Sequence, residues 1–390
     1  MSGNHSRRIF LKTAGAATVL AAGGATWRAN DQSLFSPFDG TEYEGWREWR
    51  TASGGPLHFV RASILAANPH NSQPWLFRIT GGNVDLFADP RRNIGAIDPL
   101  LREMHIGLGC ALENLVIAAE ANGYESEVRL FPNPSLLTHV ARVFLTPSSK
   151  RSAGQLYEAI GSRHTNRGPY STTRQLSLRE LDSLGDSAKS DSRLAVRWLR
   201  STSELTWMRQ TILQACKAIV ADRQQAHDSF QWIRHGADEI RQTRSGITID
   251  ALGLSPFLTA AIKMMPRPDQ TRVDEGWLRA TRDQHLATAS VFGVILAPSA
   301  HNRHWQMATG RFWERLHLLA TMRGIALHPL SQITERIDRE LTMGSSPRFG
   351  AAGRELSGGR GEVMMIFRAG FPMHEASPSP RRSVEDVVLR

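Results

Sequence analysis

Cysteine is scarce in this 390-residue chain. Cys110 and Cys216 are the only two, and their separation of 106 positions fits no metal-ligand spacing. A disulfide between them is compatible with an oxidising compartment, and the sequence leaves that pairing open. With 41% hydrophobic and 22% charged residues, the chain is neither disordered nor embedded in a membrane. Its length allows two domains or one large one.

Two other motifs are missing. No Gly-x-Gly-x-x-Gly follows a strand and opens a helix, so we expect no Rossmann domain to hold a nicotinamide permanently. His301, His304 and His317 lack the spacing of a zinc site, and we expect no metal.

Acidic residues are outnumbered, and the formal net charge is +10. Residues 1–29 contain four cations and no acid, so the rest of the chain carries +6. The Lys and Arg residues are scattered among acids rather than gathered in a stripe with aromatics, which argues against a nucleic-acid partner. A basic lining for an anionic cofactor is the simpler explanation of the charge.

The N-terminus has the pattern of an export signal. Residues 6–12 read SRRIFLK, and residues 13–26 form a short apolar run of mostly small residues. That run is well short of the roughly 20 apolar residues of a membrane span, so we expect no stable span after cleavage. Arg7 and Arg8 resemble a twin-arginine signal. The pattern predicts a signal peptide over residues 1–29, the twin-arginine machinery as a partner, a periplasmic or other extracytoplasmic location, and a cofactor loaded before export.

Residues 66–75, AANPHNSQPW, are too polar for a core strand and too interrupted for a helix. Pro69 and Pro74 bias Asn68 and Gln73 away from the helical region. The amide side chains offer donors and acceptors that suit a flat heterocycle. An ordinary polar turn after a helix is the alternative that this stretch alone leaves open.

The first part of the chain alternates between strand and helix patterns. We expect a lead-in segment over 30–55, helices over 56–67 and 103–123, and strands over 76–80, 84–89, 128–132 and 139–147. Gly81, Gly82 and Asn83 predict a hairpin turn. Gly107 and Gly109 in the long apolar helix would allow another backbone to approach closely.

The second part repeats this plan. We expect strands over 287–296, 325–330 and 362–370, a long helix over 304–323, helices over 151–163 and 177–185, and charged helical sequence over 203–245. The apolar, Gly- and Pro-interrupted segment 246–266 is a candidate lid, with a surface-packed helix pair as the alternative. The chain therefore divides into a signal peptide (1–29), a first half (30–150) and a second half (151–390), and the halves are two diverged copies of one fold.

The order of four motifs resembles the nitroreductase family of flavin enzymes. AANPHNSQPWLFRI resembles the family's Asn–x–Gln–Pro–Trp turn, and SRHTNRGPYS (162–171) its Arg-rich start. GIALHPLSQ (324–332) resembles its strand leading to Pro, and PRRSVEDVVLR (380–390) its basic tail. The resemblance covers about residues 56–390 and is greatest to the two-domain, Acg-like branch. It implies an α+β, nitroreductase-like fold: two tandem half-domains, each a mainly antiparallel sheet flanked by helices.

The distribution of these motifs has a consequence of its own. Ordinary family members are homodimers whose two FMN sites take the turn from one subunit and the Arg-rich start and tail from the other. Here the first half has the turn, whereas the second half has the Arg-rich start and the tail and lacks a turn in residues 186–200. The resemblance therefore implies a monomer that acts as an intramolecular pseudo-dimer, with one FMN.

The resemblance assigns fourteen residues to FMN. Arg163 and Arg382 would hold the phosphate, since two guanidinium groups bind it bidentately. Arg167 would lie at the ribityl chain or near N1 of the ring, on the same side as Arg163 if this segment is helical. Asn71 and Gln73 would bind the polar edges. The whole set is Asn68, Pro69, His70, Asn71, Gln73, Arg163, His164, Asn166, Arg167, Pro329, Leu330, Ser331, Arg381 and Arg382. Leu330, Ser331 and Gln332 replace the family's usual Glu–Gly near N5.

The chemistry implied is that of the flavin. A hydride from transiently bound NADH or NADPH would reach N5 and pass to a small, electron-poor acceptor, with no catalytic side chain required. The main alternative is an exported protein that binds or sequesters FMN with little turnover, because segment 246–266 would close the cleft and NAD(P)H is scarce outside the cytoplasm. A third possibility is an exported binding protein without a cofactor.

Overall fold

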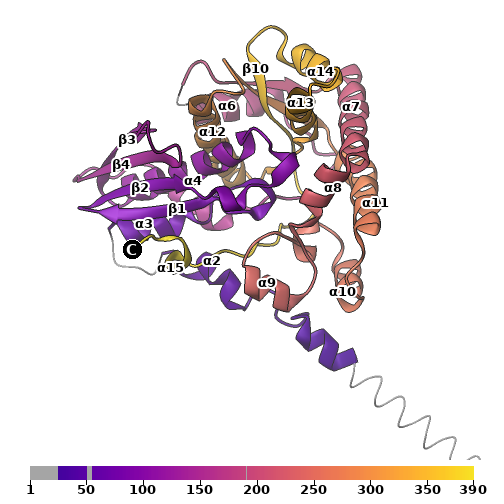
Figure 1. Cartoon of the computed structure of the whole chain (residues 1–390), viewed down its shortest axis with the longest axis horizontal. Helices are drawn as coiled ribbons and strands as arrows, with labels where there is room; N and C mark the ends of the chain where they lie inside the picture. Colours follow the sequence, from indigo (N-terminus) through magenta and orange to yellow (C-terminus); the bar gives the residue numbers. More distant parts are fainter. Residues whose placement is uncertain (1–24, 51–54, 190) are drawn as a thin grey trace, which may run out of the picture.

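The computed structural model describes residues 25–50, 55–189 and 191–390 (Figure 1). The predicted twin-arginine motif and most of the apolar run that follows it lie outside the described residues. Residues 25–31 are helical and begin the described chain.

Four strands form a sheet in the first half. They are β1 (Trp75–Thr80), β2 (Asn83–Ala88), β3 (Tyr124–Leu130) and β4 (His139–Pro147), in the order β1-β2-β4-β3, with every neighbouring pair antiparallel. β1 turns into β2 through Gly81 and Gly82, whose φ angles of 56° and 86° favour glycine. The predicted hairpin is therefore confirmed. The long helix α4 (Arg102–Ala121) connects β2 to β3.

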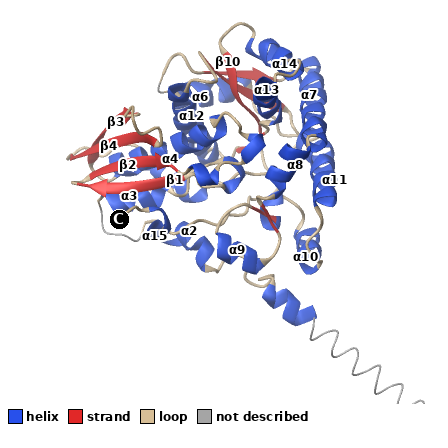
Figure 2. Ribbon diagram, in the orientation of Figure 1, coloured by secondary structure: helices blue, strands red, loops and turns tan. Residues whose placement is uncertain are grey.

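A second sheet belongs to the second half (Figure 2). Its strands are β5 (Ala195–Leu199), β8 (Val291–Ala297), β9 (Ala326–Pro329) and β10 (Glu362–Gly370), in the order β5-β8-β10-β9 and again antiparallel. The long helix α12 (Arg303–Met322) connects β8 to β9. Both sheets thus place their strands in the order first, second, fourth, third, with the long helix between the second and third. The predicted fold class is confirmed.

The two long helices cross at a pair of glycines. A Cβ atom on Gly109 would lie 2.9 Å from the Cα of Gly310, and one on Gly310 would lie 2.8 Å from the Cα of Gly109. No side chain fits between backbones this close, so both positions require glycine. Gly107 faces Pro69 and Asn68 instead. α4 is apolar and long enough to span a membrane, but here it is a buried core helix whose side chains join one hydrophobic core with both sheets.

The remaining helices cover the sheets and extend the second half. They are α2 (Glu44–Glu48), α3 (Pro56–Ser63), α5 (Gly154–Ala159), α6 (Leu178–Ala188), α7 (Thr202–Ala221), α8 (Arg223–Phe230), α9 (Ala237–Thr243), α10 (Pro256–Met264), α11 (Gln270–Ala280), α13 (Gln332–Met343), α14 (Arg348–Ser357) and α15 (Val384–Val387). Helices α7 to α11 form a layer beside the two halves, at the right and bottom of Figure 1. This layer lies between β5 and β8 in the sequence and has no counterpart in the first half.

The end of the chain returns to the first half. Val388 pairs with Phe77 of β1, and the Leu389 N–H donates to the Phe77 carbonyl at 2.7 Å. The C-terminus accordingly lies beside β1 (Figure 1). The predicted boundary at residue 150 divides the sheets, but the tail of the second half packs on the first.

Several predicted elements differ from the structure. Strand β5 was not predicted; it is a partly exposed edge strand containing Arg197, so its apolar pattern is weak. The strand expected from residue 287 begins at Val291, because helical structure continues to Leu286. The expected helical stretch 203–245 is interrupted by strand β6 (Ile233–Arg234), which pairs in parallel with β7 (Ile247–Thr248). The lead-in segment contains α2.

Candidate functional site

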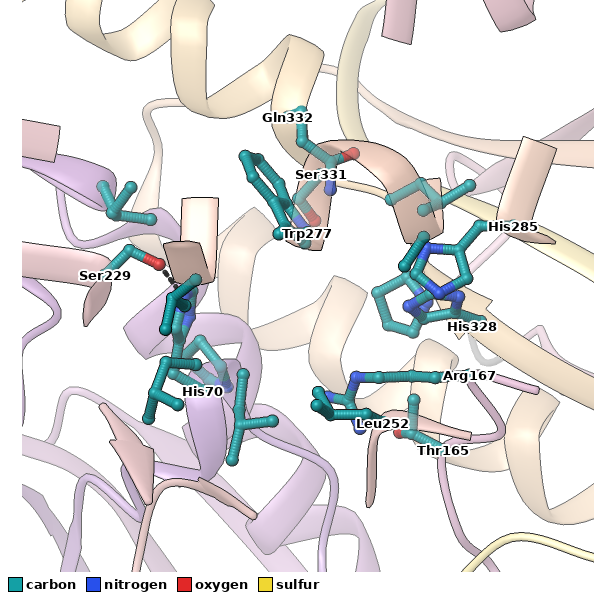
Figure 3. Close-up of a pocket in the computed structure, with 18 of the residues that line it drawn as sticks. His70, Thr165, Arg167, Ser229, Leu252, Trp277, His285, His328, Ser331 and Gln332 are labelled. Atoms are coloured by element: carbon teal, nitrogen blue, oxygen red, sulfur yellow. Dashed lines mark hydrogen bonds between the residues drawn. The ribbon is translucent and has the colours of Figure 1, made fainter. Parts of the chain in front are cut away.

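A cavity of about 860 Å³ lies where both halves meet the α7–α11 layer (Figure 3). This volume is typical of small-molecule and cofactor sites. The first half contributes Asn68, Pro69, His70 and Ile106, the second half Arg167, Trp313, His328 and Ser331, and the layer Ser229, Leu252 and Trp277. Most of the exposed wall is apolar, and polar and charged side chains from both halves and from the layer interrupt it.

The predicted turn forms one wall of the cavity. Asn68 is extended, as its position before Pro69 requires, and His70, Asn71 and Gln73 have φ angles of 50°, 52° and 53°. The His70 Nε2 lies 3.1 Å from the Ser229 hydroxyl (Figure 3). Burial, with a smaller effect of Arg167, lowers the pKa of His70 to about 4. His70 is therefore a neutral group on this wall at pH 7.

Arg167 extends into the cavity from the second half (Figure 3). Its Nη1 donates to the Ala251 carbonyl at 3.3 Å, and among the described residues no carboxylate lies within ion-pair distance of it. Burial, and then the nearby Arg368, lower its pKa to about 10. Arg167 is thus a cation at pH 7 that lacks a protein counter-ion.

Two histidines stand on the wall near Arg167. The ring centroids of His285 and His328 are 4.7 Å apart and the rings are nearly perpendicular. The Arg368 Nε donates to the His328 Nδ1 at 3.1 Å, which places the His328 proton on Nε2. Burial and Arg368 lower the pKa of both histidines well below the ordinary value. This part of the wall is polar but uncharged apart from the arginines.

Helix α13 begins at the cavity, where Leu330, Ser331 and Gln332 line it. The first N–H groups of a helix have no partner within the helix and attract electron-rich groups. Gln332 is only 9% exposed, and its Oε1 has no hydrogen-bond partner in the described part of the chain. This end of the cavity therefore offers donors and acceptors to a ligand.

Seven of the fourteen predicted residues line the cavity: Asn68, Pro69, His70, Arg167, Pro329, Leu330 and Ser331. The other seven, Asn71, Gln73, Arg163, His164, Asn166, Arg381 and Arg382, do not. Asn71 donates to the carbonyls of Gly246 and Pro380, at 3.2 and 2.9 Å. Gln73 donates to the Arg244 carbonyl at 2.7 Å and accepts from the Arg382 N–H at 2.8 Å. These amides fasten the turn to the second half rather than facing the cavity.

Arg163 and Arg167 point in different directions, because the segment between them is extended rather than helical. The helix on which their placement on one side depended is not formed. Asn166 instead donates to the His374 carbonyl at 2.7 Å. Arg382 is half-buried and donates to the Asp386 carbonyl at 2.6 Å.

Arg163 and Arg381 converge below the turn. Both donate to the Leu65 carbonyl, at 2.8 and 3.2 Å, and Arg163 pairs with Glu314 at 3.1 Å. Burial and Arg163 lower the pKa of Arg381 to about 9, so Arg381 is charged at pH 7. Two buried cations therefore share one carboxylate, and the Arg381 Nε has no partner in the described chain. Trp46 covers them, with its ring 4.9 Å from the Arg381 guanidinium and 4.5 Å from the His164 ring.

Sequence patterns did not identify several residues of the cavity wall. Trp277, His285, His328, Glu103 and Glu335 all line it. Trp277 lies just beyond the candidate lid 246–266, and six residues of that segment also form wall: Ile247, Ile249, Leu252, Leu254, Leu258 and Ile262. The apolar character of this segment is visible in the sequence, and the structure explains it because these side chains line the cavity. Phe257, on the outer side of α10, is 85% exposed.

The two cysteines do not pair with each other, and the three histidines considered for a metal have different neighbours. Cys110 and Cys216 are both free and buried. His301 contacts Asp338 at 3.3 Å, and the His304 ring lies 4.5 Å from that of Phe131. His317 instead lies beside Arg163.

Comparison with known proteins gives relatives along most of the chain. A Mycobacterium tuberculosis protein named "Putative NAD(P)H nitroreductase" is 27% identical over 84% of this chain and 88% of its own length. An uncharacterised protein of the same organism is 25% identical over 84% of this chain and 91% of its own length. Another M. tuberculosis protein, named "Putative NAD(P)H nitroreductase acg", is 34% identical over 28% of this chain and 34% of its own length.

Solved structures give more distant similarity. The FMN-dependent nitroreductase NfnB of Mycobacterium smegmatis in complex with NADPH has a TM-score of 0.35, is 15% identical, and matches 61% of this chain and 99% of its own. An FMN- and NADPH-dependent nitroreductase of a Sphingopyxis strain has a TM-score of 0.38, is 15% identical, and matches 60% of this chain and 98% of its own. No protein-family model matches the chain. Over most of its length the chain is thus similar to a protein named as a putative NAD(P)H nitroreductase, and its two tandem sheets share one strand order.

Proposed function

We propose that this chain is an FMN-dependent oxidoreductase of nitroreductase type, with one flavin in the cavity between its halves. The observation that carries the proposal is Arg167, a partly buried cation that extends into a mostly apolar cavity and has no carboxylate partner among the described residues. Flavin carries a phosphate and a ring whose reduced form is anionic, and the chain offers cations for both.

The residues present fit FMN at three places. The turn residues Asn68, Pro69 and His70 and the start of α13 at Ser331 would lie against the ring, and Arg167 near its pyrimidine edge. Arg163 and Arg381 carry an excess buried positive charge that an anion would compensate. We assign the phosphate to this pair, with Arg381 replacing Arg382, because the Arg382 side chain is half-buried and bound to a backbone carbonyl.

When bound, the flavin would accept a hydride and pass it to a second substrate. The chain's own part is to bind and to exclude water. Arg167 would stabilise negative charge on the reduced ring, and more strongly than at the surface because the cavity is of low polarity. Trp277 and the apolar residues of segment 246–266 would keep water from the ring. The relatives' names suggest NADH or NADPH as donor, and we propose a small, electron-poor acceptor.

Export by the twin-arginine route is a further part of the proposal and rests on residues 6–12. A folded protein with a loaded cofactor is the expected cargo of that route. Replacement of Arg7 and Arg8 by Lys should leave the precursor in the cytoplasm. Unchanged export of that variant would contradict the signal assignment.

The test of function is reoxidation. The FMN-loaded chain is reduced with NADPH or dithionite under anaerobic conditions, and menadione or a nitroaromatic compound is then added. Rapid return of the oxidised flavin spectrum, with formation of reduced product, would support an oxidoreductase. Bound FMN that neither acceptor reoxidises would favour the alternative, a flavin-binding protein whose cleft is closed by segment 246–266.

A further inference from the structure

Acidic side chains close the end of the cavity between α4 and α13. Glu103 of α4 and Glu335 of α13 both line the cavity, so each half contributes one carboxyl. Asp98 and Asp338 stand behind them and are each only 1% exposed. Gln332, one turn before Glu335, faces the same space with its unpartnered Oε1. An unsatisfied buried amide beside two carboxyls indicates that this end of the cavity receives a ligand.

The two rear carboxylates use the nearby donors. Arg102 pairs with Asp338 at 2.7 Å and donates to the Met364 carbonyl at 3.1 Å. Asp98 accepts from the N–H groups of Glu103 and Met104, at 3.0 and 2.8 Å. The partly exposed His301 contacts Asp338 at 3.3 Å. Arg102 and the N–H groups of Glu103 and Met104 therefore bind acceptors other than the two front carboxyls.

Glu103 and Glu335 face the same end of the cavity and lie near enough for the charge of one to raise the pKa of the other. Neither carboxyl accepts a hydrogen bond from any N–H group of the described chain, and the Glu103 Oε1 is buried without a partner. Two neighbouring carboxylates that lack a donor are costly to bury while both are ionised. We therefore expect the pair to hold one proton between them.

The surroundings keep that proton in place at neutral pH. The charged or titratable groups that face the pair are Asp98, Arg102, Asp338 and the Cys216 thiol of α7. Burial raises the pKa of Glu335 to about 7, with Arg102 opposing, and raises that of Glu103 well above its ordinary value. A proton held by this pair is therefore available to a ligand in the cavity at neutral pH.

We propose that the Glu103–Glu335 pair is the proton donor for the electron acceptor, an inference that rests on the proposed function. The acceptor gains a hydride from the reduced flavin, which returns to its oxidised form, and one proton from the pair. A quinone thereby becomes a hydroquinone. The pair is left with one more negative charge and regains its proton from solvent. Matching acceptors are small quinones or similar compounds whose reduced oxygen needs a proton.

The shared proton can be observed without any flavin. The flavin-free chain labelled with ¹³C-glutamate should show the infrared C=O band of a protonated glutamic acid at pH 7. This band should be absent from Glu335→Gln and from Glu103→Gln. It should persist in Asp283→Asn, which removes an exposed carboxyl on the same cavity wall. Gln keeps the shape of Glu and removes a buried charge, so both variants should fold.

The role in transfer is then measured on the FMN-loaded chain. With the flavin reduced by dithionite, reoxidation by menadione should be at least ~10-fold slower in Glu335→Gln and Glu103→Gln, since general acids contribute about 10²- to 10⁴-fold. Reduction by NADPH should change by less than about 2-fold, and Asp283→Asn should behave as wild type in both steps.

Two results would overturn the inference: an unchanged infrared band in both Gln variants, or unchanged menadione reoxidation in both. Failure of the wild-type chain to bind FMN would instead contradict the proposed function, and the infrared band would still decide whether the proton is shared.

Discussion

The two long helices carry the same residues at the same spacing, and yet their surroundings differ. Gly109 and Glu113 of α4 correspond to Gly310 and Glu314 of α12, and each glycine meets the other at the crossing. Both glutamates are fully buried. Glu113 is bound by Arg311 and Arg315, whose side chains are 23% and 26% exposed. Glu314 is bound by Arg163, which is only 2% exposed and has Arg381 beside it.

The two glutamate sites differ in whether solvent reaches their arginines. Arg311 and Arg315 can be hydrated, so two cations beside one carboxylate are tolerable there. Arg163 and Arg381 cannot be hydrated, and their excess charge favours an anionic ligand. The two long helices thus share one scaffold, and under the proposed function the cofactor lies on the side that carries the Arg-rich start.

The largest expected effect separates the two glutamates. Glu314→Gln leaves two buried arginines without a carboxylate and should cost about 3–5 kcal/mol of unfolding free energy in the flavin-free chain. Glu113→Gln leaves arginines that reach solvent and should cost about 1.5 kcal/mol. Urea unfolding measures both. Equal losses would show that the two sides are not different.

Alanine should lower the unfolding free energy equally at the two glycines of the helix crossing. Gly109→Ala and Gly310→Ala each place a Cβ against backbone atoms that cannot move aside, and each should cost about 1–3 kcal/mol. Gly276→Ala on α11, where no atom lies within 4 Å of the added Cβ, is the control and should be neutral or stabilising. A large loss from only one of the two crossing variants would argue against an equivalent pair.

Flavin affinity should distinguish the two tail arginines. Arg381→Ala removes a buried cation next to Arg163, so FMN affinity should fall by about 10- to 150-fold, which corresponds to one charged hydrogen bond. Arg382→Ala should have a smaller effect because its side chain is bound to Asp386. Fluorescence titration with FMN measures both. A greater loss from Arg382→Ala would restore the original assignment to that residue.

Acid should lower the stability of the folded chain through His164, which lies beside Arg163 and Trp46. Burial, followed by Arg163, lowers the pKa of His164 to about 3, so the folded chain binds this proton less readily than the unfolded chain. Stability should therefore be complete above pH 6.5 and decrease below it, by at most roughly 2 kcal/mol from this group between pH 7 and 5. His164→Gln should reduce this loss, and the exposed His227→Gln should not. An identical pH dependence in both variants would contradict the assignment.

Much of the fold could be predicted because its signals are local. Gly81 and Gly82 indicate a hairpin, the alternation of residues 76–80 indicates a strand, and Gly109 indicates a close backbone approach. Strand β5 could not be found, because its partly exposed residues have no clear period. Segment 246–266 could be recognised as apolar, but the sequence does not show that its side chains line a cavity.

The candidate site could be predicted only in part. The turn and Arg167 were found from their motifs, and both reach the cavity. The direction of Arg163 could not be found, since it depends on an extended backbone that the sequence does not specify. Glu103 and Glu335 meet only when α4 and α13 pack together, and no local pattern reports such a contact.

The most direct test of the account is the ratio of FMN to protein in the purified mature chain, measured after heat release of the flavin. One FMN per chain is the predicted result, since in the described chain one side of the α4–α12 crossing, at Arg163 and Arg381, has buried arginines in excess of carboxylates. Two per chain would mean that both sides bind flavin, and a colourless chain that takes up no added FMN would mean that neither does. Either result would contradict a single site built from both halves.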